Sequence, residues 1–570
     1  MTQDMLGYVL GGSLQEGLTV RLQVPPYRVH EGAFVVMDAP GWRFFGIVID
    51  VALRTTHPRY VENETPDLAP ALTHMLRQST LYTTATVLPV RMMEIGPDPE
   101  QDPEGYQRFL QEVDAGLRDV RPMPVKTVPP HFSPVRLADQ GDVDEIFGRP
   151  TEKATFVIGY TREQGHAVRI RLREFIKRSA GVFGATGTGK SFLTRLLLAG
   201  IMHYDVASVL LFDMHNEYAY DLPDPDRKVR IDGLKSHFHS RIRVVGLGPG
   251  TLIQNRPPDY HLQIPSSEIQ PADIELLIHA LNLPETASLV LHALYREYGD
   301  GWFEHFRSLE IGATEEVEEN GKTKTVPAEN SVEAWAKRAG MHPESARAVH
   351  RRLRLLFDRD YIAPDPPHNT LQQIIRDLQE GRHVILSFGK YESELDYLLV
   401  TNLITRKVRE AWVDMTERHR AQKDRSEPRP LVVVIEEAHK LLSREMAVQT
   451  IFSTIAREMR KYYVTLLIVD QRPSQIYDEV MSQLGTRISG WLGDEEDIRA
   501  VLAGLANRDA LRNMLAHLEP REEALVMGWG VPLPIVVRTR RYDETFWQEL
   551  QGARASIRGK PDDLNRALFG

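Results

Sequence analysis

The chain has 570 residues, with 69 Lys and Arg against 79 Asp and Glu, a net charge of -10 and no cysteine. The lack of cysteine excludes disulfides and thiolate metal sites, and the acidic balance argues against a surface coated in nucleic acid. A chain this long exceeds one hydrophobic core and predicts roughly three or four structural units. It holds no apolar run of about 18 residues and no signal peptide, so we expect a cytoplasmic protein without membrane contact.

Residues 1–175 are predicted to form a small N-terminal β-barrel with proline-rich connections. Runs rich in Val, Ile and Phe, separated by Gly, Pro and Asp, are typical of short strands in a barrel or sandwich. They cover residues 6–13, 18–24, 32–39 and 43–53. Residues 96–105 and the prolines between 122 and 134 indicate surface connections. The apolar runs at 154–161 and 166–172 are expected to close the barrel.

From residue 176 onward strands alternate with helices, which predicts a RecA-like α/β core over 176–258 and 366–545. Short apolar runs, several of them hydrophobic throughout, are typical of parallel strands covered on both faces. They lie at 180–185, 208–214, 383–389, 431–439, 464–472 and 488–493. Helix-like segments replace them between 259 and 365, which predicts a helical insertion with an exposed loop or hairpin at 312–330. Residues 546–570 are expected to be a C-terminal tail.

Residues 184–191, GATGTGKS, match the pattern G-x-x-x-x-G-K-[ST] at every fixed position. Glycines let the backbone curl around a polyphosphate, and the apolar spacing after Ser191 predicts a helix whose N-terminus favours phosphate. We therefore predict an ATP site in which Lys190 reaches the β- and γ-phosphates and the Ser191 hydroxyl ligates Mg²⁺. The alternative, a glycine-rich turn that binds nothing, fits a full match poorly. The predicted nucleotide-binding residues are Gly184, Ala185, Thr186, Gly187, Thr188, Gly189, Lys190, Ser191 and Phe192.

Two acidic pairs follow apolar runs, at the strand ends where open α/β sheets bind ligands. Glu436 is predicted to hold the metal through its water shell, and Glu437 to polarise the attacking water. The alternative for this pair is a solvated helix start. Asp213 and Glu217 share a face and point into the site if the chain turns helical after the strand. Otherwise Asp213 is only a helix cap.

Gln471 follows a third strand run, where a glutamine senses the γ-phosphate or orients water. The alternative is a simple strand-to-turn junction. A hydrolase of this kind commonly receives an arginine from a neighbouring subunit, because a planar guanidinium meets the charge on the transferred phosphoryl group. Arg178, just ahead of the phosphate loop, and Arg457 and Arg460 are the candidates. For each arginine a solvated helix face is the alternative.

Taken in order, these motifs resemble the HerA family of hexameric DNA motors, within the HerA and FtsK group. The resemblance rests on GYVLGGS, GIVIDV, KRSAGVFGATGTGKS, DMHNEY, VVVIEEAHKLL, AREMRKYYVTLLIVDQRPSQI and MSQLGTRI. It covers most of the chain and is strongest over 178–220 and 431–492. It implies that Lys190 and Ser191 bind the nucleotide and the metal, and that Glu436 and Glu437 form the Walker B motif. It also implies that Asp213 and Glu217 form an acidic motif and that Gln471 is a sensor. Arg178 and Arg460 are then the candidates for trans-acting arginines.

The resemblance implies an ATP-dependent translocase or helicase, a homo-hexamer that threads duplex DNA of any sequence through its pore. The barrels would form a collar that docks a partner: a NurA-type nuclease in DNA end processing and repair, or a sirtuin-like NADase or another nuclease in antiphage defence. Two alternatives are an ATPase scaffold that activates a partner enzyme and a conjugation or secretion motor. The basic segment that carries Arg347, Arg351, Arg352 and Arg354 is either a DNA contact, a solvated face or an intersubunit surface.

Overall fold

The computed structural model describes residues 5–56, 81–223, 230–319, 322–423, 426–447, 450–505 and 508–557. Its contacts divide the chain into two units. The first comprises Met1–Phe175, Val182–Leu193 and Gly485–Arg541, and the second comprises Ile176–Gly181, Thr194–Leu484 and Tyr542–Gly570. The phosphate loop therefore belongs to the first unit, and the predicted acidic pairs belong to the second.

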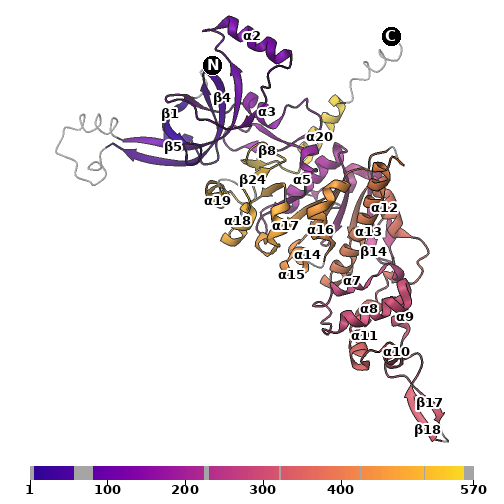
Figure 1. Ribbon diagram of the computed structural model, residues 1–570. Coiled ribbons are helices and arrows are strands. Elements are labelled where there is room, and N and C mark those ends of the chain that lie inside the picture. The colour runs from indigo at the N-terminus through magenta and orange to yellow at the C-terminus, as the bar shows by residue number, and fades with distance from the viewer. Residues whose placement is uncertain are drawn as a thin grey trace, which may run out of the picture. The chain divides into compact units, whose positions relative to one another are not determined.

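Six strands at the N-terminus form a closed barrel (Figure 1). The ring runs β2-β1-β7-β3-β4-β5 and closes where β5 pairs with β2, while β6 adds to β5 outside the ring. Inward-facing aliphatic residues such as Leu6, Val20 and Val35 fill its interior. The predicted barrel is confirmed, with these strands: β1 (Met5–Ser13), β2 (Gly17–Leu22), β3 (Phe34–Ala39), β4 (Gly41–Thr55), β5 (Leu81–Gly96), β6 (Met123–Pro124) and β7 (Pro134–Leu137).

The expectation that the runs at 154–161 and 166–172 close this barrel is wrong. They form β8 (Thr155–Thr161) and β9 (Ala167–Arg171), which pair with each other. β8 then pairs with β25 (Ile535–Thr539), in the order β23-β24-β25-β8-β9 with β23 (Thr486–Ser489) and β24 (Glu523–Gly528). The barrel needs no further strand because the long β5, which the sequence reading did not identify, supplies the last edge.

Helices of the first unit lie beside the barrel and this antiparallel sheet. One of them, α2, begins within the segment interpreted as a connection, where the Asp102 side chain accepts a hydrogen bond from the Gly105 backbone at 2.9 Å. An aspartate in this position caps a helix N-terminus. The helices are α2 (Pro103–Asp114), α3 (Gln140–Phe147), α4 (Leu172–Phe175), α18 (Glu495–Leu502) and α19 (Arg508–Ala516).

The second unit is built on a parallel sheet in the order β15-β14-β20-β11-β21-β22. Every residue of β11, β20, β21 and β22 is buried, as expected for strands covered on both faces. β10 (Ala180–Phe183), which leads into the phosphate loop, begins in this unit and ends in the first. The other strands are β11 (Ser208–Asp213), β14 (Ile242–Leu247), β15 (Tyr260–Leu262), β20 (His383–Ser387), β21 (Leu431–Glu436) and β22 (Val464–Asp470).

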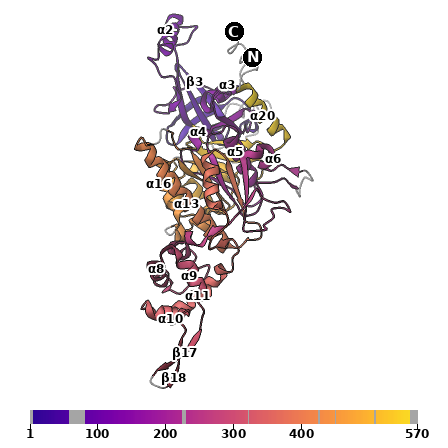
Figure 2. The ribbon, with the colours of Figure 1, turned by 90° about the vertical axis from the view of Figure 1, so that its right-hand side faces the viewer.

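Helices cover this sheet, and α13 and α16 lie side by side on one face of it (Figure 2). The last helix, α20, begins at Glu544 and covers the first part of the segment expected to be a tail, and its Trp547 ring stacks on His237 with the ring centroids 3.6 Å apart. Residues 558–570 lie outside the described residues. The helices are α5 (Lys190–His203), α6 (Leu234–Phe238), α12 (Thr370–Gln379), α13 (Glu394–Arg420), α14 (His439–Leu442), α15 (Arg444–Ala447), α16 (Ile451–Glu458), α17 (Asp478–Gln483) and α20 (Glu544–Ile557).

The predicted helical insertion is confirmed between β15 and β20. Its helices pack around an aromatic core that includes Trp302, Phe306 and Trp335. A hairpin extends from it beyond α10 (Figures 1 and 2). The elements are α7 (Pro271–Glu275), α8 (Ala287–Tyr298), α9 (Trp302–Ser308), β17 (Thr314–Glu319), β18 (Lys322–Pro327), α10 (Val332–Arg338) and α11 (Pro343–Phe357). Short two-residue strands pair elsewhere in the unit: β12 (Leu222–Pro223) with β13 (Arg230–Ile231), and β16 (Ile264–Pro265) with β19 (Ile362–Ala363).

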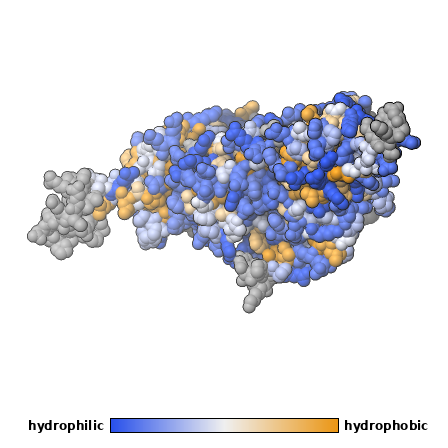
Figure 3. Space-filling view, turned by 90° about the horizontal axis from the view of Figure 1, so that it is seen from below, coloured by the Kyte–Doolittle hydropathy of each residue, from blue (hydrophilic) through white to orange (hydrophobic). Residues whose placement is uncertain are grey.

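The surface seen in Figure 3 is mostly hydrophilic, and its hydrophobic residues are scattered over separate small areas. Within the described residues, no helix has both the length and the apolar character needed to cross a membrane.

Candidate nucleotide site

The phosphate loop connects β10 to α5, which begins at Lys190. Its three glycines have positive φ angles: 153° at Gly184, 77° at Gly187 and 91° at Gly189. A Cβ atom on Gly184 would lie 2.5 Å from the Thr188 hydroxyl oxygen, so a larger residue does not fit there. The motif therefore adopts a curled backbone that L-residues with side chains rarely reach.

Internal hydrogen bonds hold the loop in this curl. The Lys190 Nζ donates to the Ala185 carbonyl oxygen at 3.1 Å, and the Thr188 hydroxyl donates to the same oxygen at 2.7 Å. The Ala185 backbone N–H donates to the Trp491 carbonyl at 2.9 Å, which ties the loop to the segment after β23. Lys190 thus folds back over the loop, in a position to meet an anion bound in its concavity.

Arg521 also contacts the loop, although no sequence pattern predicted this contact. Its Nε donates to the Gly187 carbonyl oxygen at 3.0 Å. Arg521 lies just before β24 with a φ of 73°, so a left-handed turn directs this exposed side chain to the loop. The two residues are 334 positions apart, and only the folded sheet brings them together.

Glu436 is the last residue of β21 and is buried, with 7% of its surface exposed. The Tyr218 hydroxyl donates to its Oε1 at 2.5 Å, and the Tyr397 hydroxyl donates to its backbone carbonyl at 2.7 Å. Its second carboxylate oxygen, Oε2, is buried and has no hydrogen-bond partner among the described residues. A buried oxygen of this kind is suited to a ligand that the polypeptide does not supply.

The surroundings of Glu436 carry excess negative charge. Burial, together with the neighbouring carboxylates Asp213 and Glu217, raises the pKa of Glu436 to about 8, while the Tyr218 hydrogen bond opposes this. Burial also raises the pKa of Asp213 to about 6. A cation relieves such repulsion, which fits the predicted Mg²⁺. No described group of three His, Asp or Glu side chains is arranged to hold a metal by itself, so such an ion would need further ligands such as phosphate and water.

Asp213 and Glu217 lie close together, but not on a helix. The Asp213 carboxylate accepts hydrogen bonds from the backbone N–H groups of Glu217 at 2.8 Å and Tyr218 at 3.0 Å. Asn216 has a φ of 57°, which ends any helical course. Asp213 therefore closes a tight turn after β11, and the helical arrangement that we considered is wrong because the side chain captures the N–H groups first. This turn also places the Tyr218 hydroxyl within hydrogen-bond distance of Glu436.

Glu437 lies outside the buried strand, with about a fifth of its side chain exposed, and meets Gln471 at the end of the next strand. The Gln471 amide donates from Nε2 to the Glu437 Oε2 at 3.1 Å. His439 is also near, with its Nδ1 3.6 Å from the same oxygen and 2.9 Å from Asp470 Oδ2. The sequence reading missed His439 and Asp470, although each is within two residues of a predicted site residue.

The candidate arginines occupy distinct environments in the second unit. Arg457 pairs with Glu479 at 3.1 Å. Arg460 is exposed on the 3₁₀ helix Met459–Tyr462, and Arg178 is partly buried. Burial and, to a lesser extent, the charge of Arg460 lower the pKa of Arg178, so these two guanidinium groups are neighbours.

The basic helix α11 presents two kinds of arginine. Arg347 pairs with Glu333 at 2.9 Å and with Glu344 at 3.1 Å. Arg351, Arg352 and Arg354 are exposed and have no ion pair within the described part of the chain. They form an unneutralised cationic surface on the insertion.

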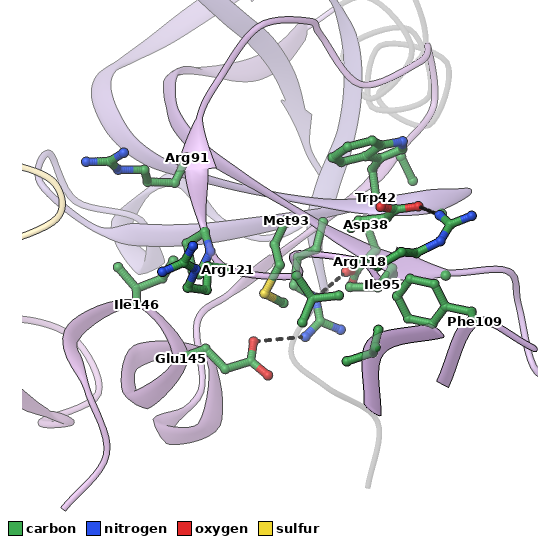
Figure 4. A pocket seen from close by; sticks show the side chains of 18 of the residues that line it. Asp38, Trp42, Arg91, Met93, Ile95, Phe109, Arg118, Arg121, Glu145 and Ile146 are labelled. Carbon is green, nitrogen blue, oxygen red and sulfur yellow. Dashed lines mark hydrogen bonds and ion pairs between the residues drawn. The ribbon is translucent and has the colours of Figure 1, made fainter. Parts of the chain in front are cut away.

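A groove of about 2290 Å³ lies in the first unit, between α2, the strands β4 and β5 and residues 528–534 (Figure 4). Its walls mix aromatic and charged side chains, including Trp42, Phe109 and Arg118, and Arg118 pairs with Glu94 and Glu112. It contains none of the predicted catalytic or nucleotide-binding residues, so it is a feature separate from the candidate site.

The family described as "Helicase HerA, central domain" matches residues 156–408. The DNA double-strand break repair helicase HerA of Sulfurisphaera tokodaii is 24% identical over 98% of this chain and 99% of its own length. The HerA helicase of Pyrococcus furiosus is 23% identical over 66% of this chain and 68% of its own. Among solved structures, the bacterial conjugative coupling protein TrwB aligns with 71% of this chain and 92% of its own at 13% identity, with a TM-score of 0.44.

The matched family segment contains the phosphate loop and the Asp213 turn, and the similarity to a HerA helicase extends from one end of the chain to the other. The chain is therefore similar to HerA helicases over nearly its whole length.

Proposed function

We propose that this protein is an ATP-dependent DNA translocase or helicase that acts as a homo-hexameric ring on duplex DNA. Similarity to the HerA family and to relatives named as DNA double-strand break repair helicases supports this proposal. The observation that carries it is the arrangement at the ends of β21 and β22. A buried acidic residue, Glu436, stands next to an accessible Glu437 that contacts Gln471.

The phosphate loop and the acidic strand ends act on one bound ATP. Backbone N–H groups of residues 184–191 hold the phosphates, and Lys190 exchanges its Ala185 contact for the β- and γ-phosphates. Ser191 and Glu436 hold Mg²⁺, which supplies charge stabilisation when bound. Glu437 accepts a proton from the attacking water, and Gln471 orients that water.

A cation from a neighbouring subunit completes this site. Arg460 is the first candidate, because it is exposed and forms no ion pair within the described residues. Arg178 is the second, since it lies beside Arg460. Arg457 is the weakest because Glu479 already neutralises it. Repulsion between Arg178 and Arg460 is relieved when either one contacts phosphate on the adjoining subunit.

The exposed arginines of α11 contribute to DNA binding by neutralising backbone phosphates. Such contacts are independent of sequence and sensitive to salt. Arg351→Ala and Arg352→Ala are each expected to weaken DNA binding. For each variant the loss should be the same with duplexes of unrelated sequence, and the affinity should depend less on salt. Arg347→Ala is the matched control, since its charge is already paired with Glu333 and Glu344. Equal losses in all three variants would contradict this role.

A partner enzyme acts together with the ring. The names of the relatives favour a role in DNA double-strand break repair. In that setting we propose DNA end processing with a NurA-type nuclease as the partner. A defence setting with a sirtuin-like NADase is the other arrangement that we considered. Copurification of this chain with each candidate enzyme tests which of them binds it. Nuclease and NADase assays then distinguish the repair setting from the defence setting.

The decisive experiment measures ATP hydrolysis with and without duplex DNA. We expect stimulation by duplexes of unrelated sequence, together with ATP-driven displacement of a third strand from a triplex. Lys190→Ala serves as the negative control. A rate of ATP hydrolysis that DNA does not change, combined with activation of a partner enzyme, would instead identify an ATPase scaffold.

A further inference from the structure

Asp470 connects the two strand ends that carry Glu437 and Gln471. Its buried carboxylate accepts the His439 backbone N–H at 2.7 Å through Oδ2 and the Arg472 backbone N–H at 2.6 Å through Oδ1. The first of these N–H groups lies just after β21 and the second just after β22. One side chain therefore fixes the spacing of the two turns that hold Glu437 and Gln471.

The His439 ring extends this connection to Glu437. Its Nδ1 lies 2.9 Å from Asp470 Oδ2 and 3.6 Å from Glu437 Oε2. Asp470, as an acceptor, keeps a proton on Nδ1, so the N–H edge of the ring also faces Glu437. The hydrogen bond to Asp470 is also the main reason why the pKa of His439 is raised, with burial acting against it.

Both neighbours of Glu437 contact the same oxygen. Gln471 Nε2 lies 3.1 Å from Oε2, and His439 Nδ1 approaches Oε2 from the other strand end. Within the described part of the chain no contact is made to Oε1. Glu437 itself has a φ of 47°, an uncommon backbone conformation for a residue with a side chain. Its carboxylate is therefore directed by its surroundings, with one oxygen held and the other left to face water.

We propose that His439, held by Asp470, is a positioning residue that orients the Glu437 carboxylate for proton abstraction from the attacking water. This inference rests on the role proposed above for Glu437. A general base must hold its accepting oxygen within hydrogen-bond reach of the water, and a misplacement of about 1 Å costs up to about a hundredfold in rate. A glutamate with a partly exposed side chain has several rotamers that miss this position. His439 removes them without touching the substrate.

The test compares His439→Asn with His439→Gln in steady-state ATP hydrolysis by the full-length protein. The Asn amide nitrogen replaces Nδ1, whereas the Gln amide nitrogen lies one bond farther out and replaces Nε2. We expect His439→Asn to retain most of the parent kcat. We expect His439→Gln and His439→Ala to lose about ten- to a hundredfold in kcat, while KM for ATP changes less than about twofold. Added imidazole should restore part of the kcat of His439→Ala.

A double substitution tests whether His439 acts through Glu437. If it does, Glu437→Gln combined with His439→Ala is no slower than Glu437→Gln alone, because the group being positioned is already absent. His368→Ala, at an exposed histidine of the same unit, is the control and should keep the parent kcat. Melting curves check that each variant is folded.

Several outcomes would overturn the positioning role. They are a His439→Ala variant with parental kcat, Asn and Gln variants that are equally slow, or a loss that adds fully to that of Glu437→Gln. A purely structural role would lower the melting temperature of all three His439 variants and would give no rescue by imidazole. An active Glu437→Gln variant is a different failure, because it would overturn the proposed role of Glu437 itself.

Discussion

The Tyr218 hydroxyl donates a hydrogen bond to Glu436 Oε1 at 2.5 Å, and the two residues are separated by 218 positions in the chain. Both side chains are buried. This bond joins the turn after β11 to the end of β21. It is the only described hydrogen bond to the Glu436 carboxylate, whose other oxygen is unpartnered. Tyr218 therefore supports the residue predicted to hold the metal.

Tyr218→Phe should lower the free energy of unfolding by about 1–3 kcal/mol, because a buried carboxylate loses its hydrogen-bond donor. Chemical denaturation followed by circular dichroism measures this change. Tyr220→Phe is the control, since that hydroxyl donates to Pro257 at the surface and its loss should cost little. Equal stability of the two variants would mean that the Tyr218 bond contributes nothing net.

Lys190→Ala should reduce ATP turnover by about a hundredfold or more while the protein remains folded, as is typical when a group that meets transition-state charge is removed. In the folded chain Lys190 donates to the Ala185 carbonyl within its own loop and contributes little to core packing. Turnover and the melting temperature are measured on the same preparation. A folded variant with near-normal turnover would remove Lys190 from the site.

Arg521→Ala should raise KM for ATP by about three- to tenfold, because the charged hydrogen bond that holds the Gly187 carbonyl is lost. The melting temperature should stay close to that of the parent, since the side chain is exposed. Arg499→Ala removes an exposed arginine of α18 that pairs with Glu495 instead, and its KM should not change. A parental KM in Arg521→Ala would show that the loop keeps its shape without this contact.

Arg460→Ala should bind ATP and form rings yet hydrolyse ATP slowly, because the phosphoryl group then lacks its cation from the neighbour. Mixing Arg460→Ala subunits with Lys190→Ala subunits should restore some turnover, since one type of junction combines an intact loop with an intact arginine. If the subunits exchange and the mixture stays inactive, or if Arg460→Ala is fully active, Arg178 becomes the candidate.

The stability of the fold should fall as the pH drops from 6.5 toward 3. His383 is fully buried in β20, and neither ring nitrogen has a hydrogen-bond partner among the described residues. Burial lowers its pKa from 6.5 to about 3, with the charges of Arg241 and Arg429 adding to the effect. The unfolded chain therefore binds a proton in this range that the folded chain does not, which favours unfolding.

His383→Leu removes this proton-linked term, so its melting temperature should fall less on acidification than that of the parent. Thermal melts at several pH values between about 7 and 5 measure the slope. His368→Leu, at an exposed histidine, should keep the parental slope. Identical slopes in the parent and His383→Leu would mean that other groups dominate the acid response.

Features that depend on neighbouring residues could be predicted from the amino-acid sequence. The phosphate loop is a contiguous motif, and its glycines take the positive φ angles that the pattern requires. The wholly apolar runs became the buried parallel strands, and Glu436, Glu437 and Gln471 lie at their ends as expected. Local spacing sufficed there because a fully buried strand needs an unbroken apolar segment.

Which distant segments meet could not be predicted in this way and became visible only in the folded chain. β8 pairs with β25 and β9 pairs with β8, because β2 and β5 already close the barrel, and no local pattern records that competition for strand edges. Asp213 closes a turn because its carboxylate reaches two backbone N–H groups before a helix can form. Hydrogen bonds of Tyr218 with Glu436 and of Arg521 with Gly187 join residues hundreds of positions apart. Such contacts depend on sheet order and burial, which sequence periodicity does not encode.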